Sequence, residues 1–217
     1  MTQIKICGLT TSDSLGTVIE VGADYAGLVF YPPSPRYVTI EQAAELARQA
    51  AGQVQLVGLF VAPEHAAVEA VLKSVPLDAL QIYGSPAQAS QLRRAFKLPV
   101  WRQFGVASPA DFPAHEEEAD GFVVEAKPPP GATRPGGNGI LADWDVLANF
   151  KPGRPWLLAG GLNPDNVESA LARTAAPGVD VSSGVETRPG QKCPALIRQF
   201  VAAVRRGQEA GPAYFST

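Results

Sequence analysis

Cys7 and Glu125 stand where their side chains could exchange protons with a small molecule. Cys7 ends an apolar run near the start of the chain and precedes Gly8, and Glu125 ends the run that begins at Gly121. A thiolate near positive charge can act as a base, and a carboxyl group in partly apolar surroundings can act as an acid. Two alternatives stay open: a cysteine that only packs in the core, and a glutamate paired with Lys127.

Two glycine-containing turns later in the chain could hold a phosphate group. Gly160 and Gly161 follow an apolar run and precede Asn163 and Pro164, so we expect their N–H groups at a helix N-terminus, where anions bind. Further hydroxyl and amide donors follow the next apolar run, at Ser182, Ser183 and Gly184. Each turn alone could be an ordinary connection, but their placement after the last two strands favours a phosphate site.

Arg36 is the candidate for binding a second anionic group. It lies in the proline-rich segment 31–38, where its planar guanidinium could hold a carboxylate or a phosphate. Simple solvation is the alternative for any arginine. The two histidines, His65 and His115, fall in a helical segment and in an acidic surface stretch, so we interpret both as solvated and expect no metal site.

Short apolar runs alternate with helix-compatible segments along the chain. The runs are residues 3–7, 25–30, 54–60, 79–82, 98–103, 121–125, 155–159 and 178–181. Most are continuously apolar, which is typical of parallel strands covered on both faces. The segments between them are residues 14–21, 39–51, 63–73, 86–96, 143–150, 164–173 and 194–206, with a weaker one at 108–118 that prolines shorten. N-cap residues are expected at Thr39, Asp143 and Asn163.

This alternation, repeated eight times, predicts an α/β fold, a single (β/α)8 TIM barrel, better than an open doubly wound sheet. We expect residues 1–207 to form the barrel and residues 208–217 a C-terminal tail. Loops that follow the strands form the active face of such barrels. The long connections 31–38 and 126–140 both follow strands, so both are expected at that face.

The composition and charge favour a small molecule as the partner of this chain. The 217 residues are 46% hydrophobic and carry a formal net charge of -3 without a lysine or arginine run, which argues against nucleic-acid and anionic-membrane partners. Two cysteines far apart and no leader segment argue against a disulfide framework. No apolar run reaches the roughly 18 to 20 residues of a membrane span. We therefore expect a cytoplasmic protein, with monomer and homodimer both open.

Over nearly its whole length the sequence resembles the phosphoribosylanthranilate isomerase family of tryptophan biosynthesis. The matching motifs are residues 5–10, 22–24 with 27–30, 34–36, 135–139 with 143–144, 159–162 and 180–186. The resemblance implies a TIM barrel that needs neither cofactor nor metal. It also implies an Amadori rearrangement of N-(5-phosphoribosyl)anthranilate to 1-(2-carboxyphenylamino)-1-deoxyribulose 5-phosphate.

The resemblance also assigns roles to residues. An acid protonates the furanose ring oxygen, and a base, Cys7, removes a proton from C2 of the opened iminium. Arg36 would meet the anthranilate carboxylate, and Asp180 would make a further ligand contact. The phosphate would be held by Gly160, Gly161, Ser182, Ser183 and Gly184.

Two positions depart from the family pattern, since Glu125 replaces the acidic aspartate and Tyr83 replaces a histidine. One extra methylene moves the carboxylate by about 1 Å, which can change a rate on the order of 100-fold, so Glu125→Asp is expected to keep or raise activity. Three hypotheses follow: an active isomerase, a phospho-ligand binder without turnover, and an isomerase of a related phosphosugar. The segment with Lys192 and Cys193 also departs, and we expect it to lie far from the chemistry.

Overall fold

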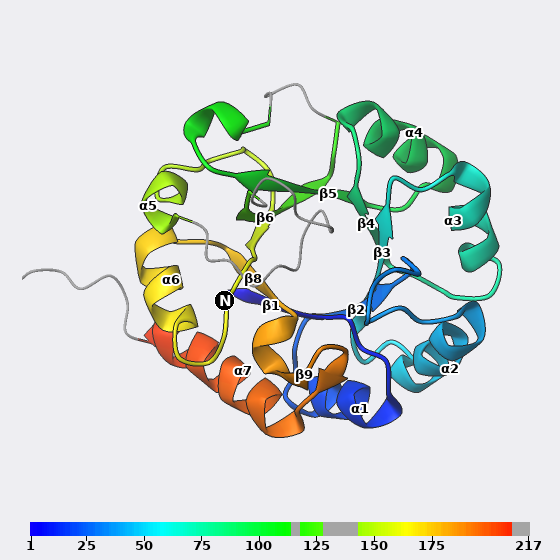
Figure 1. Ribbon diagram of the computed structural model, residues 1–217, viewed down its shortest axis with the longest axis horizontal. Helices are drawn as coiled ribbons and strands as arrows, with labels where there is room; N and C mark the ends of the chain where they lie inside the picture. The colour runs from blue at the N-terminus through cyan, green and yellow to red at the C-terminus, as the bar shows by residue number, and fades with distance from the viewer. Residues whose placement is uncertain (114–117, 128–142, 210–217) are drawn as a thin grey trace, which may run out of the picture.

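The computed structural model describes residues 1–113, 118–127 and 143–209. Eight parallel strands close into a barrel in chain order, with helices packed around the outside (Figure 1). The strands are β1 Gln3–Cys7, β2 Tyr25–Val29, β3 Gln55–Val61, β4 Ala79–Tyr83, β5 Val100–Val106, β6 Gly121–Ala126, β7 Trp156–Leu158 and β8 Gly178–Val181. The predicted single (β/α)8 TIM barrel is confirmed, and every strand overlaps its predicted run.

The helices overlap the predicted segments, except for the weak segment 108–118. They are α1 Ser12–Glu20, α2 Ile40–Ala50, α3 His65–Leu72, α4 Pro86–Phe96, α5 Trp144–Leu147, α6 Val167–Thr174 and α7 Pro194–Glu209. Between β5 and β6 the described residues contain a single 3-10 turn, Pro109–Asp111, where the prolines limit helix growth. Helix α7 continues to Glu209, and residues 210–217 of the predicted tail lie outside the described residues.

Two of the three predicted N-caps are confirmed and the third is wrong. The Thr39 hydroxyl accepts from the N–H of Gln42 in a capping box, and the Asp143 carboxylate accepts from the N–H of Asp145. Helix α6 starts at Val167 instead of at residue 164. Its N-cap is Asn166, because the Asn163 side chain accepts from the N–H groups of Asp165 and Asn166 and makes a separate turn. This turn spans residues 163–166.

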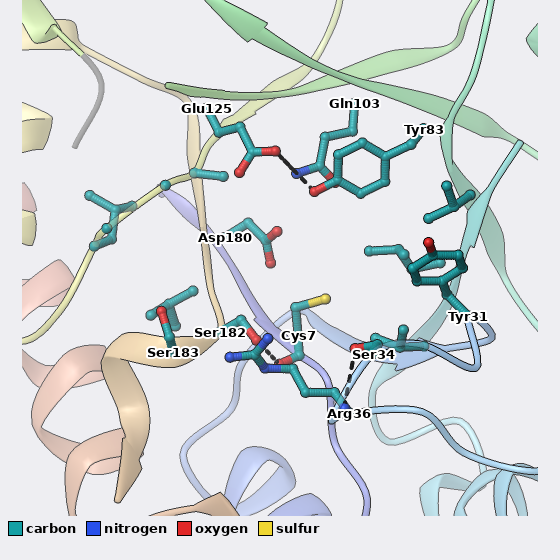
Figure 2. A pocket seen from close by; sticks show the side chains of 18 residues that line it. Cys7, Tyr31, Ser34, Arg36, Tyr83, Gln103, Glu125, Asp180, Ser182 and Ser183 are labelled. Carbon is teal, nitrogen blue, oxygen red and sulfur yellow. Dashed lines mark hydrogen bonds between the residues drawn. The ribbon is translucent and has the colours of Figure 1, made fainter. Parts of the chain in front are cut away.

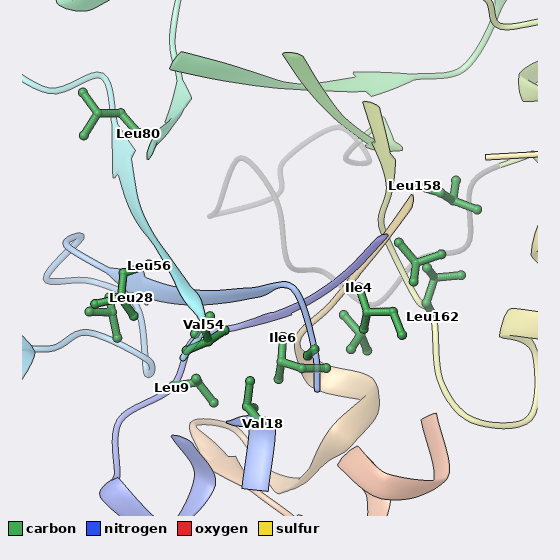
Figure 3. Close-up of a cluster of buried hydrophobic side chains, with 14 of the residues drawn as sticks. Ile4, Ile6, Leu9, Val18, Leu28, Val54, Leu56, Leu80, Leu158 and Leu162 are labelled. Atoms are coloured by element: carbon green, nitrogen blue, oxygen red, sulfur yellow. The ribbon is translucent and has the colours of Figure 1, made fainter. Parts of the chain in front are cut away.

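Side chains alternate between the barrel interior and the helices along each strand. On β1, Ile4 and Ile6 face outward into the main hydrophobic core, together with Leu28, Leu56 and Leu158 from neighbouring strands (Figure 3). Burial of one such side chain contributes about 1.5 to 3 kcal/mol, so this layer between strands and helices supplies much of the stability. The other face of β1 carries Lys5 and Cys7 into the barrel.

Aspartates join three pairs of strands at the N-terminal end of the barrel. The carboxylate of Asp24, before β2, accepts from the N–H of Ile4, whose carbonyl accepts from the N–H of Asp24. Asp78 makes the same two bonds with Leu56, and Asp120 makes them with Val100. We call these three reciprocal contacts the aspartate clamps. The pair β7 and β8 has Pro177 at the equivalent place and a register of one residue pair, Leu158 with Val179.

Within the described ranges, no helix is both long and apolar enough to cross a membrane. Cys7 and Cys193 are both free thiols.

Candidate active site

A cavity at the C-terminal ends of the strands brings most of the predicted site residues together. Cys7 and Glu125 both line it. Figure 2 shows Glu125 on one side of this cavity and Cys7 on the other, with Asp180 between them. The cavity is also lined by predicted ligand-binding residues, namely Arg36, Gly160, Gly161, Asp180, Ser182 and Ser183. The thiol and the carboxyl group can therefore both reach one bound molecule.

Cys7 lies on a strand whose interior face is charged. Two residues earlier on the same face, the fully buried Lys5 donates from Nζ to Asp180 Oδ1 on β8 at 2.9 Å. Gly27 on β2 leaves room for the thiol, because a Cβ at that position would lie 2.9 Å from Sγ. The thiol is thus held beside an ion pair that closes the barrel between its first and last strands.

Burial raises the pKa of the Cys7 thiol, because a thiolate loses solvation inside the barrel. The positive charges of Lys5 and Lys192 lower it, and the negative charge of Asp180 raises it further. Burial pulls the pKa of Lys5 down, but the charges of Asp180 and Cys7 outweigh that effect and raise it. Lys5 therefore stays protonated and offers a cation to a thiolate.

Glu125 accepts two hydrogen bonds on the opposite side of the cavity. The Tyr83 hydroxyl donates to Oε1 at 2.9 Å, and Gln103 Nε2 donates to the same oxygen at 2.8 Å. The side-chain NH2 group of Gln81 in turn donates to the side-chain amide oxygen of Gln103. Burial and the charge of Glu125 raise the pKa of Tyr83 well above its usual value, so the phenol remains a donor. These two neutral donors therefore help to anchor the glutamate.

Arg36 borders the cavity with part of its guanidinium already bonded. Its Nε and one terminal nitrogen donate to the two carboxylate oxygens of Glu186 at 2.7 and 2.8 Å. Gly8, with a φ of +76°, lets the arginine stem fold over the end of β1, since a Cβ there would lie 2.5 Å from the arginine Cδ. Two of the five guanidinium N–H groups are used in this way, and the side chain still lines the cavity.

Lys192 contradicts the expectation that its segment lies far from the chemistry. It ends the hairpin of β9, Glu186–Arg188, and β10, Gln191–Lys192, and is 8% exposed. Its ammonium donates to Glu186 at 2.6 Å and to the carbonyl and hydroxyl oxygens of Ser182 at 3.0 and 3.1 Å. The Ser182 hydroxyl donates to the carbonyl oxygen of Cys7 at 3.0 Å. The lysine thus supports both the arginine and the end of the cysteine strand.

The predicted phosphate cradle is formed by loops instead of by a helix N-terminus. Gly160 and Gly161 have φ values of +85° and +67°, which glycine adopts without strain. They line the cavity with Ser182 and Ser183, but α6 begins only at Val167. Their N–H groups therefore do not lie at the N-terminus of a helix, as the sequence had predicted. Any anion that binds there would be held by loop amides and hydroxyls.

Gly184 has a different place from the other predicted phosphate residues. A Cβ at this position would overlap the carbonyl oxygen of Leu162, in the loop that follows β7. The glycine therefore lets the loops after β7 and β8 approach each other, and it is absent from the described residues that line the cavity.

The wall near β2 to β4 is apolar. Cys7, Val29 and Leu59 form a small hydrophobic cluster, against which Tyr31, Val61 and Tyr83 pack. The cavity therefore has an apolar side suited to an aromatic ring and a side of loop amides and hydroxyls suited to an anion.

Sequence reasoning missed four residues of this site: Lys5, Gln103, Glu186 and Lys192. The alternation of side chains along a strand could have identified Lys5, because Lys5 and Cys7 are two residues apart and share a face. The predicted glycine motif 135–139 and His115 lie outside the described residues. Among the residues that are described, no cluster of three or more histidine, cysteine or acidic side chains could hold a metal ion.

The chain is similar in sequence and in fold to enzymes of one family. Residues 4–203 match the family model described as N-(5'phosphoribosyl)anthranilate (PRA) isomerase. N-(5'-phosphoribosyl)anthranilate isomerase from Granulibacter bethesdensis is 52% identical over 204 residues, which cover 94% of this chain and 98% of that protein.

Solved structures of this kind superpose along most of the chain. Phosphoribosyl anthranilate isomerase from Thermotoga maritima has a TM-score of 0.81 and 31% identity, covering 95% of this chain and all of that one. A phosphoribosyl anthranilate isomerase in complex with reduced 1-(o-carboxyphenylamino)-1-deoxyribulose 5-phosphate has a TM-score of 0.82 and 30% identity, covering 95% of this chain and 100% of that one.

Proposed function

The chain belongs to the phosphoribosylanthranilate isomerase family, whose reaction is an Amadori rearrangement in tryptophan biosynthesis, and we propose that Cys7 is its base and Glu125 its acid. The observation that carries the proposal is the single cavity that both side chains line. Its apolar wall and its glycine loops match the two ends of N-(5'-phosphoribosyl)anthranilate, an aryl group and a phosphate.

The reaction begins with proton transfer from the acid. Glu125 gives its proton to the furanose ring oxygen, the bond between that oxygen and C1 breaks, and the nitrogen lone pair forms a C1–N iminium. Ring opening therefore leaves a cation in the cavity and a carboxylate on Glu125. The hydrogen bonds from Tyr83 and Gln103 stabilise that carboxylate as it forms.

The second proton transfer goes to Cys7. The thiolate takes the proton from C2, and the electrons of that C–H bond form the C1–C2 double bond and neutralise the iminium nitrogen. An iminium cation beside the thiol favours the thiolate, which opposes the rise in pKa caused by burial. The resulting enolamine tautomerises to the ketone of the product.

Binding would use the two other parts of the cavity. The phosphate lies against Gly160, Gly161 and the hydroxyls of Ser182 and Ser183, and the remaining edge of the Arg36 guanidinium meets the anthranilate carboxylate. Asp180 neutralises Lys5 and borders the cavity, so it contributes to the shape and charge of the site. The same proposal places the enzyme in the cytoplasm, where free thiols such as Cys7 and Cys193 persist.

The test is turnover of phosphoribosylanthranilate by the purified protein and by two variants. Cys7→Ala and Glu125→Gln are each expected to lower kcat by about 100- to 10,000-fold, with unchanged circular dichroism. Wild-type turnover that survives Cys7→Ala would reject the thiol as base. Phosphate-ester binding without any turnover by the wild-type protein would instead identify a ligand binder.

A further inference from the structure

The hairpin of β9 and β10 contacts both the side chain of Arg36 and the loop that carries it. Glu186 accepts two hydrogen bonds from the guanidinium, from Nε at 2.7 Å and from Nη2 at 2.8 Å. At the turn of the hairpin, Gly190 lies so close to the loop that a Cβ there would overlap the carbonyl oxygen of Pro35. The hairpin therefore holds the backbone beside Arg36 and also the plane of its guanidinium.

The bonds to Glu186 determine which edge of the guanidinium faces a ligand. They use the edge formed by Nε and Nη2. The outer N–H groups of Nη1 and Nη2, which these bonds do not use, are parallel and match the two oxygens of a carboxylate. Figure 2 shows this end of Arg36 reaching toward Ser182 at the border of the cavity. The glutamate thus directs the outer edge of the fork toward a ligand.

Lys192 sets the charge of this group of side chains. Its ammonium donates to Glu186 Oε1 at 2.6 Å and to the carbonyl and hydroxyl oxygens of Ser182 at 3.0 and 3.1 Å, so three acceptors meet its three protons. A pair of Arg36 and Glu186 alone would be neutral. With the lysine, two cations surround one carboxylate, and the group keeps a net positive charge.

The ionisation of Glu186 and Lys192 is mutually dependent. Burial raises the pKa of Glu186, but the hydrogen bonds and charges of Arg36 and Lys192 outweigh burial and lower that pKa overall. Burial lowers the pKa of Lys192, and the charge of Glu186 opposes this effect. The carboxylate therefore stays ionised between its two cations and supports the charge of the lysine.

We propose that Glu186 and Lys192 are positioning residues that act through Arg36. The glutamate orients the guanidinium, and the lysine keeps the group net positive for the carboxylate of a ligand. This inference rests on the proposed contact between Arg36 and the anthranilate carboxylate. It gives a role to a hairpin that is separate from the barrel sheet and yet supplies two side chains that are at most 3% exposed.

The test compares two ligands by calorimetric titration: the product 1-(2-carboxyphenylamino)-1-deoxyribulose 5-phosphate, and its counterpart without the carboxyl group. Lys192→Met is expected to raise the Kd of the product about 10-fold and the Kd of the counterpart by less than about twofold. Binding is measured instead of turnover, because Lys192 also lowers the pKa of the Cys7 thiol. The same change for both ligands, including none, would assign Lys192 a merely structural role and overturn the inference.

Glu186→Gln tests the orientation and keeps the inference testable should Lys192→Met not fold. The amide has nearly the same shape but presents N–H groups to a guanidinium that also donates, so the Kd of the product should again rise about 10-fold, with less than about twofold for the counterpart. Tighter binding of the product would overturn the role of Glu186. Arg188→Met, which removes an exposed cation from β9, is the matched control and should change neither Kd.

The proposed function can fail separately from this inference. If Arg36→Met weakened both ligands equally, the arginine would not be the carboxylate contact, and the proposed binding mode would fail. If Arg36→Met lost the preference for the product while Lys192→Met and Glu186→Gln kept it, the binding mode would stand and only the positioning by the hairpin would be rejected. Thermal melting of each variant separates these effects from unfolding.

Discussion

The two ends of the barrel use charged side chains in opposite ways. Toward the C-terminal end, the side chains of Lys5, Asp180 and Glu186 are at most 8% exposed and bond to other charged groups. At the N-terminal end, Asp24 and Asp78 are exposed and bond to the backbone of a neighbouring strand. The same residue types therefore serve one end as buried ion pairs and the other as clamps between strands.

This difference shows at which end of the barrel the charged side chains cost folding free energy. Removing a charge from water costs several kcal/mol, and a buried ion pair often does no better than an apolar pair of the same volume. An exposed aspartate that accepts a backbone N–H has no such cost, and it satisfies a donor at the start of a strand. Substitutions at the cavity should consequently change activity, and substitutions at the clamps should change stability alone.

Lys5→Met should give the largest effect, because it leaves the Asp180 carboxylate buried without its cation. We expect the free energy of unfolding to fall by about 3 to 5 kcal/mol in urea titrations, and activity to be lost. The double variant Lys5→Met with Asp180→Asn should recover part of the stability, since the buried charge is gone, but none of the activity. If Lys5→Met alone were as stable as the wild type, the buried ion pair would not differ from the exposed clamps in its effect on stability.

Lys192→Met should have an intermediate effect, visible in the reactivity of Cys7. The positive charge of Lys192 lowers the pKa of the Cys7 thiol, so its removal should move the pH midpoint of Cys7 alkylation upward, with Lys5 still in place. The measurement is made in a Cys193→Ser background so that one thiol reacts. Lys73→Met, at the exposed residue that follows α3, is the matched control and should leave the midpoint unchanged.

Asp78→Ala should have the smallest effect. Loss of one clamp is expected to lower the free energy of unfolding by about 1 kcal/mol, with kcat/KM unchanged. Glu45→Ala, which removes an exposed carboxylate on α2, should change stability by less than about 0.5 kcal/mol. A fall in kcat/KM for Asp78→Ala would show that the two ends are coupled.

The fold was predictable because its signals are local. Continuous apolar runs indicate parallel strands, and a residue such as Thr39 marks a helix start through its own side chain. The start of α6 was mispredicted because Asn163 has the same chemistry as an N-cap but closes a turn. An asparagine can either cap a helix or close a turn, and the sequence alone did not distinguish the two.

The site was predictable only in part, because its contacts join distant strands. Cys7 ends β1 and Ser182 directly follows β8, so their place at the rim follows from the barrel. The bond between Tyr83 and Glu125 spans 42 residues of sequence, and no pattern in a single chain pairs them. Lys192 lies in a hairpin of three- and two-residue strands, which is too short to give a periodic signal.

The short register between β7 and β8 has a consequence for motion. This pair has one paired residue on each strand, and Pro177 stands where three other strand pairs have an aspartate clamp, so it is the least constrained closure in the barrel wall. The loops above it carry Gly161 and Ser182, the proposed phosphate contacts. An anion that bonds to both loops would act as a staple across this pair, so occupancy by substrate and tightening of the barrel would be one thermodynamic event.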